Sequence, residues 1–377
     1  MKLTRAQFLK ALPAAALVLA GCTAAPTAPA DTDELVFDHT YPLDYATQFT
    51  ADCYADGSTL LTIPDAQAKF LVRPEGAATL RTVPEGVTVL QQPLQNLYLV
   101  STSVMDLFLA LDALDCIALS GTRAEGWYLD EARQAMLDGR IAYAGKYSAP
   151  DYEQILAANC GLAIENTMIY HTPEVKEQLE RFGIPVLVER SSYESGPLAA
   201  WSGSNSTASC WARRNWHSRC LTDRRSASLP CWTSSPPARA ARSFLSRPTI
   251  WQRAQGRRLC GRMIEMAGAD YVFADLTDNG NSLSTMNLPL EDFYAGARDA
   301  DFLIYNSTIE GVVSTTDELV AKCSLLADFK AVQNGHVWCV AQSFFQQSME
   351  LADFILELHR LFTEDAPDGL QYFIHVE

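Results

Sequence analysis

Residues suited to nucleophilic or metal chemistry occur in this chain, but their spacing matches no catalytic or metal-binding pattern. Ser191, Ser192 and His171 come closest to a hydrolase set, yet no Gly-x-Ser-x-Gly elbow and no glycine-rich phosphate loop is present. Of the histidines, only His171 and His336 lie away from the two ends and from the unusual segment treated below, too few for a His-rich metal site. We therefore predict neither an enzyme nor a resident metal. A hydrolase and a zinc- or manganese-binding protein stay as alternatives.

Cys22 is the one thiol in a specific chemical context. Lys2, Arg5 and Lys10 precede an apolar run over 11–20, which is too short to span a bilayer but suits a signal peptide. The sequence Leu-Ala-Gly-Cys that ends at Cys22 resembles a lipobox, in which the cysteine is acylated. The pattern predicts an exported protein that lipid on Cys22 anchors to the outer face of a bacterial membrane.

Five further cysteines lie outside the signal peptide and the unusual segment. Their number is odd and no pair has metal-site spacing, so we predict buried thiols rather than a disulfide framework. They are Cys53, Cys116, Cys160, Cys323 and Cys339.

Composition limits the possible partners. The formal net charge of -16 argues against nucleic acid and against a basic membrane-binding surface. Residues 23–34 are rich in Ala, Pro and Thr and predict a flexible tether. Beyond the tether, roughly 340 residues remain, more than one core usually serves, so two lobes are expected.

The elements expected after the tether begin with short strands. Alternating apolar and polar residues predict strands over 45–49, 59–63 and 69–73, with turn signals at Asp56-Gly57 and at 74–76. A β-meander is therefore expected first.

Strand and helix patterns then interleave. We predict strands over 97–100, 117–119, 143–144, 162–164 and 185–188, and helices over 105–114, 130–137, 151–158 and 173–182. The last helix should start at Pro173 behind an N-cap at Thr172 and end at Gly183. Such alternation predicts a mostly parallel sheet with helices on its faces.

Alternating strand and helix patterns resume at Met263, after the unusual segment. Strands are expected over 271–273, 302–305 and 337–340, and helices near 290–298, 316–323 and 349–362. The expected organisation is a signal peptide (1–22), a tether (23–34), an N-terminal α/β lobe (35–196), a connecting helix and the start of the second lobe (197–262), and a C-terminal α/β lobe (263–377).

Several sequence segments resemble segments of solute-binding proteins of ABC importers for iron-siderophore, haem and cobalamin. They run over 145–153 (Gly-Lys-Tyr-Ser-Ala-Pro-Asp-Tyr-Glu), 162–166 (Leu-Ala-Ile-Glu-Asn), 183–188 (Gly-Ile-Pro-Val-Leu-Val) and 331–338 (Ala-Val-Gln-Asn-Gly-His-Val-Trp). The resemblance covers about 35–195 and 263–365. It implies two α/β lobes joined by one long helix, of the class III periplasmic-binding-protein type, with ligand held between the lobes. It also implies a permease and an ATPase as partners.

The resemblance assigns candidate ligand residues to loops of both lobes. Aromatic faces can grip a flat chelate, and Lys or Arg can neutralise an anionic one. The first-lobe candidates are Trp127, Tyr128, Lys146, Tyr147, Tyr170, His171, Arg190 and Tyr193, and the second-lobe candidates are Tyr305, Asn306, Trp338, Phe344 and Gln346. We expect only part of this set to touch ligand.

Family members also present an acidic residue on each lobe to Arg on the permease. The matching positions implied here are Glu174 in the first lobe and Glu310 or Asp317 in the second. The expected ligand is an iron chelate, haem or a corrinoid, and the sequence does not choose among them. A purely structural or adhesive lipoprotein is a further alternative.

Residues 199–262 differ sharply in composition from the rest of the chain. They contain twelve Arg, no Lys, five of the seven Trp, four of the ten Cys and a single acid, Asp223. Twelve arginines with one acid are costly to bury, and four prolines interrupt regular elements. This stretch is therefore expected to form no well-packed structure.

A reading-frame lesion would explain the change. Read one base out of register with permitted codons, residues 201–216 spell an amphipathic helix of the kind that the resemblance implies between the lobes. Residues 250–260 give a family-like sequence in the other shifted phase. We hypothesise three lost bases, with the frame restored by Met263, and resequencing the gene tests this.

Overall fold

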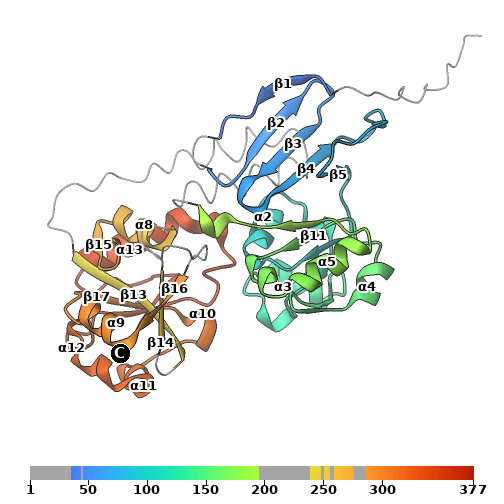
Figure 1. Ribbon diagram of the computed structural model, residues 1–377. Helices are drawn as coiled ribbons and strands as arrows, with labels where there is room; N and C mark the ends of the chain where they lie inside the picture. Colours follow the sequence, from blue (N-terminus) through green and yellow to red (C-terminus); the bar gives the residue numbers. More distant parts are fainter. Residues whose placement is uncertain (1–34, 44–45, 195–237, 248–249, 255–258, 276–284) are drawn as a thin grey trace, which may run out of the picture.

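The computed structural model describes two α/β lobes that lie side by side (Figure 1). The described residues are 35–43, 46–194, 238–247, 250–254, 259–275 and 285–377. The predicted signal peptide, the tether, Cys22 and the connecting helix expected within 197–237 lie outside them. No helix in the described ranges is both long and apolar enough to cross a membrane.

The first lobe opens with a five-stranded sheet. Its strands follow chain order as β1 (Phe37–Thr40), β2 (Thr50–Tyr54), β3 (Thr59–Ile63), β4 (Ala68–Arg73) and β5 (Val87–Gln91). The expected meander is confirmed, because β1 to β4 pair antiparallel, although β1 was not among the predicted strands; β5 pairs parallel with β4. The strand expected over 45–49 is wrong, because pairing with β3 starts only at Thr50.

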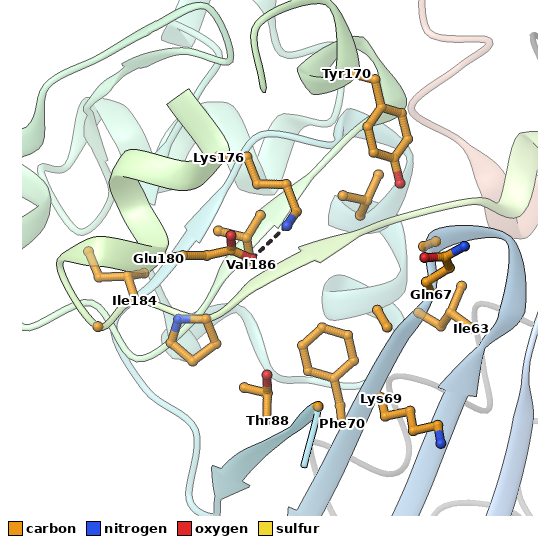
Figure 2. Close-up of a pocket in the computed structure, with 16 residues that line it drawn as sticks. Ile63, Gln67, Lys69, Phe70, Thr88, Tyr170, Lys176, Glu180, Ile184 and Val186 are labelled. Carbon is orange, nitrogen blue, oxygen red and sulfur yellow. Dashed lines mark hydrogen bonds and ion pairs between the residues drawn. The ribbon is translucent and has the colours of Figure 1, made fainter. Parts of the chain in front are cut away.

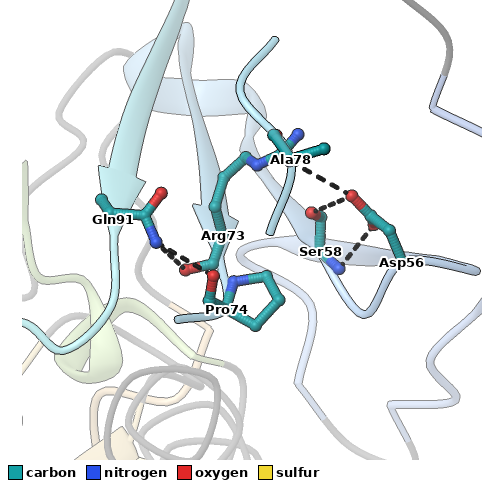
Figure 3. A network of polar contacts seen from close by, with 6 residues as sticks. All are labelled: Asp56, Ser58, Arg73, Pro74, Ala78 and Gln91. Carbon is teal, nitrogen blue, oxygen red and sulfur yellow. Dashed lines mark hydrogen bonds and ion pairs between the residues drawn. The ribbon is translucent and has the colours of Figure 1, made fainter. Parts of the chain in front are cut away.

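A polar network ties the β2–β3 turn to the end of β4 (Figure 3). The Arg73 side chain is buried, lies 3.4 Å from the Asp56 carboxylate and donates to the carbonyl of Ala78. Asp56 also accepts from the backbone and hydroxyl of Ser58 at 2.9 Å. The buried guanidinium is thus held by partners on two neighbouring turns.

A parallel sheet completes the first lobe, in the order β12 (Val186–Val188), β11 (Ala163–Glu165), β6 (Leu97–Leu99), β7 (Ile117–Ser120) and β8 (Ala142–Tyr143). One face packs against the first sheet, α2 (Met105–Ala110) and α3 (Asp130–Leu137). The other packs against α4 (Tyr152–Ala157) and α5 (Pro173–Arg181). A small hairpin, β9 (Gly145–Lys146) and β10 (Ala149–Pro150), follows β8. The predicted alternation is confirmed.

The predicted limits of α5 are mostly confirmed. Pro173 occupies the first turn, and Gly183 lies just beyond the helix with φ 77°. Thr172, however, makes no side-chain capping bond, and its buried hydroxyl has no partner among the described residues. The predicted N-cap position at Thr172 is therefore confirmed, but without a side-chain capping bond.

The second lobe is built on a mixed sheet in the order β16 (Thr285–Pro289), β14 (Ile250–Ala254), β13 (Ala238–Arg247), β17 (Phe302–Tyr305), β18 (Val337–Val340) and β19 (Phe373–His375), with β15 (Ala269–Tyr271) beside β13. Its helices are α8 (Leu259–Met266), α9 (Leu290–Ala297), α10 (Ser307–Glu310), α11 (Thr316–Lys322), α12 (Lys330–Gln333) and α13 (Leu351–Thr363). Stacked rings of Phe273, Phe293 and Phe329, with centroids 5.8 and 5.7 Å apart, fill one side of the sheet.

Part of the Arg-rich stretch enters this sheet. The backbone of β13 pairs parallel with β17 and antiparallel with β14. The expectation that residues 199–262 form no well-packed structure therefore does not extend to the backbone pairing of these two strands, and the burial of their side chains lies outside the described part of the chain. A sheet ladder needs only backbone groups, so an unfavourable side-chain composition does not prevent pairing.

A buried carboxyl gives the first lobe a pH-dependent stability. Glu165 on β11 is fully buried, neither of its oxygens has a partner among the described residues, and burial raises its pKa from 4.5 to about 8. The folded protein therefore keeps a proton that the unfolded chain releases. Stability should be greatest below pH 4.5 for this group and fall by up to about 1.4 kcal/mol per pH unit until about pH 8.

We expect Glu165→Gln to remove this slope, because the amide carries no charge at any pH. Thermal unfolding between pH 5 and 8 measures it. Glu177→Gln, which changes an exposed carboxylate on α5, is the matched control and should keep the slope. An unchanged slope in Glu165→Gln would contradict the assignment.

Candidate functional site

The carboxyl ends of the parallel strands are where an open α/β sheet usually binds ligand. In the first lobe these ends lead into the loops after β6, β7, β8, β11 and β12. In the second lobe they lead into the loops after β17 and β18. Figure 1 places α10, which follows β17, on the side of the second lobe that faces the first.

The loop after β18 crosses to the first lobe. The Gln346 side chain is buried and bonds to two backbone groups there, with its Nε2 donating to the Gly126 carbonyl at 2.7 Å and its Oε1 accepting from the Tyr128 amide at 2.8 Å. Both partners lie in the loop after β7. One side chain thus fixes the carboxyl ends of β18 and β7 against each other.

Two further contacts extend this attachment. The Ser348 hydroxyl donates to the Ser103 carbonyl at 2.7 Å, and the Met349 amide donates to Asp106 Oδ2 at 2.8 Å. The Met349 side chain packs in the core of the first lobe. We call residues 346–349 together with Ser103, Asp106, Gly126 and Tyr128 the lobe junction.

Two exposed aromatic rings flank the lobe junction, one from each lobe. Tyr128, whose amide donates to Gln346, is 39% exposed. Phe345, which precedes Gln346 in the chain, is 42% exposed. Phe344 is buried instead, 5.1 Å from Phe345 and 4.7 Å from Phe354 between ring centroids. Sequence reasoning chose Phe344 and missed Phe345. The two neighbours have the same side chain and differ in that one ring lies inside the lobe and the other at its surface, which the sequence does not reveal.

Basic side chains lie at several neighbouring strand ends. Arg123, in the loop after β7, lies with its guanidinium 4.0 Å from the ring centroid of Tyr143 at the end of β8. Lys146 follows β8 and is exposed, and His171 is exposed at the end of the loop after β11. Arg123 was not predicted. In an acidic protein these groups suit an anionic ligand.

Two predicted first-lobe residues have structural partners instead. Trp127 is fully buried, and its Nε1 donates to Ser120 Oγ at 3.2 Å. The Arg190 side chain is 9% exposed and binds Asp65 at 3.0 Å, with its guanidinium 4.6 Å from the Tyr193 ring centroid. These interactions leave little of either side chain for a ligand.

The remaining first-lobe candidates fall into two places. The buried Tyr193 donates to Thr167 Oγ1 at 3.0 Å, and the partly buried Tyr147 packs against the core beside α4 and α5. Tyr170 is 46% exposed and lines a cavity between β12 and the first sheet (Figure 2). None of the three takes part in the junction contacts.

The second-lobe candidates are mostly packed inside. Asn306 is buried and caps α10 by accepting from the Thr308 amide at 3.2 Å. The buried Trp338 lies 4.8 Å from His375 between ring centroids. Tyr305 is 1% exposed, and burial raises its pKa. Of the second-lobe set, only Gln346 takes part in the junction.

The acidic candidates for permease contact differ in their surroundings. Glu174 is exposed in the first turn of α5, and Asp317 is exposed in the first turn of α11. Glu310 instead pairs with Lys322 at 3.3 Å. Asp317 is therefore the freer of the two second-lobe choices.

Metal-binding residues do not converge in the described ranges, where no group of three or more His, Cys, Asp or Glu has metal-site geometry. His336 stacks on Phe302 at 4.9 Å between centroids. Of the five thiols predicted to be buried, Cys339 is buried and the other four are partly buried, and none of the five forms a disulfide.

Comparison with solved structures identifies the fold. The periplasmic haem-binding protein HutB of Vibrio cholerae matches 70% of this chain and 98% of its own, with a TM-score of 0.54 at 15% identity. A periplasmic haem-binding protein of Pseudomonas aeruginosa matches over 75% and 98% with a TM-score of 0.54 at 16% identity. A possible iron-binding periplasmic solute-binding protein of Staphylococcus epidermidis matches 72% of this chain and 99% of its own, with a TM-score of 0.54 at 14% identity. No family model and no curated protein matches the sequence.

These matches confirm the fold class expected from the sequence. The chain has the two-lobed α/β fold of class III periplasmic binding proteins. At such low identity the likeness establishes the fold and assigns no ligand.

Proposed function

We propose that this chain is the solute-binding lipoprotein of an ABC importer, which captures an iron chelate, haem or a corrinoid outside the cytoplasm. The fold is compatible with this role, and the proteins of known structure that share it include haem- and iron-binding ones. The ligand would lie at the lobe junction, between the carboxyl ends of the two sheets.

The observation that carries the proposal is that each lobe brings an exposed ring to the Gln346 bonds: Tyr128 donates its amide to Gln346, and Phe345 precedes Gln346. A flat apolar ligand held between the lobes would cover apolar area on both rings, which favours binding. Arg123 and Lys146 at the adjoining strand ends would neutralise acidic groups of the same ligand.

Direct titration tests the proposal. We expect haemin, a ferric siderophore or cobalamin to bind saturably to the full chain and to quench its tryptophan fluorescence. Binding of Zn²⁺ or Mn²⁺ alone, with none of the chelates, would favour the metal-ion alternative from the sequence. Turnover of an ester or amide substrate would favour the hydrolase alternative.

Membrane anchoring is a separate part of the proposal. Because acylation needs the thiol, Cys22→Ala should move the protein from the membrane fraction to the soluble extracytoplasmic fraction. Fractionation with an antibody measures the shift, and Cys53→Ala is the matched control. Membrane retention of Cys22→Ala would contradict the lipobox.

Permease docking through carboxylates gives a further expected result. Glu174→Arg and Asp317→Arg should each reduce uptake about tenfold while leaving chelate affinity unchanged, because a cation there repels permease arginines. Glu177→Arg on the same helix as Glu174 is the control. Equal uptake in all three variants would rule out docking at these positions.

A further inference from the structure

A cavity of about 590 Å³ lies in the first lobe, away from the lobe junction contacts. Figure 2 shows β12 passing between Lys176 and Glu180 of α5 on one side and Phe70 and Thr88 of the first sheet on the other. The cavity thus follows the free side of β12.

β12 is the terminal strand of the parallel sheet. Its bonds to β11 use the Pro185 carbonyl, which accepts from Ala163, and the Glu189 amide, which donates to Glu165. Bonding direction alternates along a strand, so the N–H and C=O groups of Val186 and Val188 point away from β11. Both residues line the cavity.

This edge is recessed rather than open to the surface. Val186 and Val188 are each 4% exposed. Among the described residues, no backbone partner accepts from or donates to their outward groups. Buried backbone groups without partners cost free energy, so the edge favours anything that supplies a matching row of donors and acceptors.

The side chains around the cavity form an apolar side and a polar side. Ile63 and Phe70 of the first sheet are buried and give an apolar wall. Lys176 and Glu180, paired at 2.6 Å, and the half-exposed Tyr170 give a polar rim. A strand inserted here would present alternate side chains to the wall and to the rim.

We propose that this groove, which we call the β12 groove, binds an extended peptide segment of a partner protein by adding a strand to β12. Residues 185–188 offer an edge for about four residues at roughly 3.3 Å each, because the Ile184 amide already donates to the Leu179 carbonyl. A small molecule cannot match the repeating donors and acceptors. A second copy of the chain cannot reach an edge recessed between α5 and the first sheet. The peptide has alternating apolar and polar residues, with its polar side chains on the side of the paired Lys176 and Glu180.

The proposal is tested with an acetylated and amidated peptide, Ser-Val-Glu-Val-Glu-Val-Ser, and the full chain. The peptide should slow deuterium exchange of the Val186 and Val188 amides by at least tenfold at saturation. Val188→Pro should weaken its binding by at least tenfold. Proline there removes only the outward N–H, and edge strands accept proline in that orientation. Val188→Ala, which keeps the N–H, is the matched control and should still bind.

Two results would overturn the proposal. One is the absence of exchange protection over 184–189 at millimolar peptide. The other is equal binding by a peptide that is N-methylated at all five residues between its two serines, since that peptide cannot form the ladder with either set of its amides facing β12. Chelate binding at the lobe junction is measured on the same variants and should not change. The proposal of chelate binding and the proposal of peptide binding are therefore tested independently.

Discussion

Replacing Tyr128 and Phe345 together by alanine is expected to weaken chelate binding by about 100-fold. Each ring is more than a third exposed in the free protein, so truncation should cost little folding stability. In the complex, truncating a covered aromatic residue typically costs 1–2 kcal/mol or more, which is about tenfold in affinity for each ring. The rings come from different lobes, so we expect their effects to be nearly additive.

Titration of the two single variants and the double variant measures this loss. Phe182→Ala is the matched control, because that ring is 41% exposed but follows α5, away from the junction contacts. Wild-type affinity in the double variant would show that the ligand lies elsewhere.

Gln346→Leu is expected to loosen the lobe junction. Leucine keeps the bulk but leaves the Gly126 carbonyl and the Tyr128 amide without their partner. Both bonds are only partly buried, and such a bond contributes about 0.5–1.5 kcal/mol, so the free energy of unfolding should fall by roughly 1–3 kcal/mol. Exchange of the Tyr128 amide should speed up at least tenfold, and chelate affinity should fall because the two rings lose their fixed separation.

Gln347→Leu is the control for this change. Gln347 is the neighbouring residue, and its buried Oε1 has no partner among the described residues, so the substitution removes no such contact. If both variants exchanged Tyr128 at the same rate, the proposed role of Gln346 would be contradicted.

Much of the fold was predictable because strand and helix periods are local. The limits of α3, β17 and β18 agree with the sequence prediction, and α5 starts at Pro173 as expected. The missed strands β1, β5, β16 and β19 and the misplaced β2 depend on sheet pairing with other segments of the chain, which no local pattern contains.

The candidate site was less predictable, because loop residues find partners far away in sequence. Arg190 pairs with Asp65, 125 residues earlier, and this contact makes it structural. Gln346 reaches back 218 residues to Tyr128 and forms the junction. Trp127 and Tyr128 are adjacent, yet one ring is buried and the other exposed. Residue type alone cannot assign these roles.

Deuterium exchange on the chelate complex tests the central claim most directly. The chelate is the one that saturates the full chain in the titration, with haemin tested first. If ligand lies at the lobe junction, binding should protect the loops over 123–128 and 341–346 together, because they come from opposite lobes and meet at Gln346. Protection confined to 63–70 and 184–188, around the β12 groove, with no change in these two loops, would contradict it.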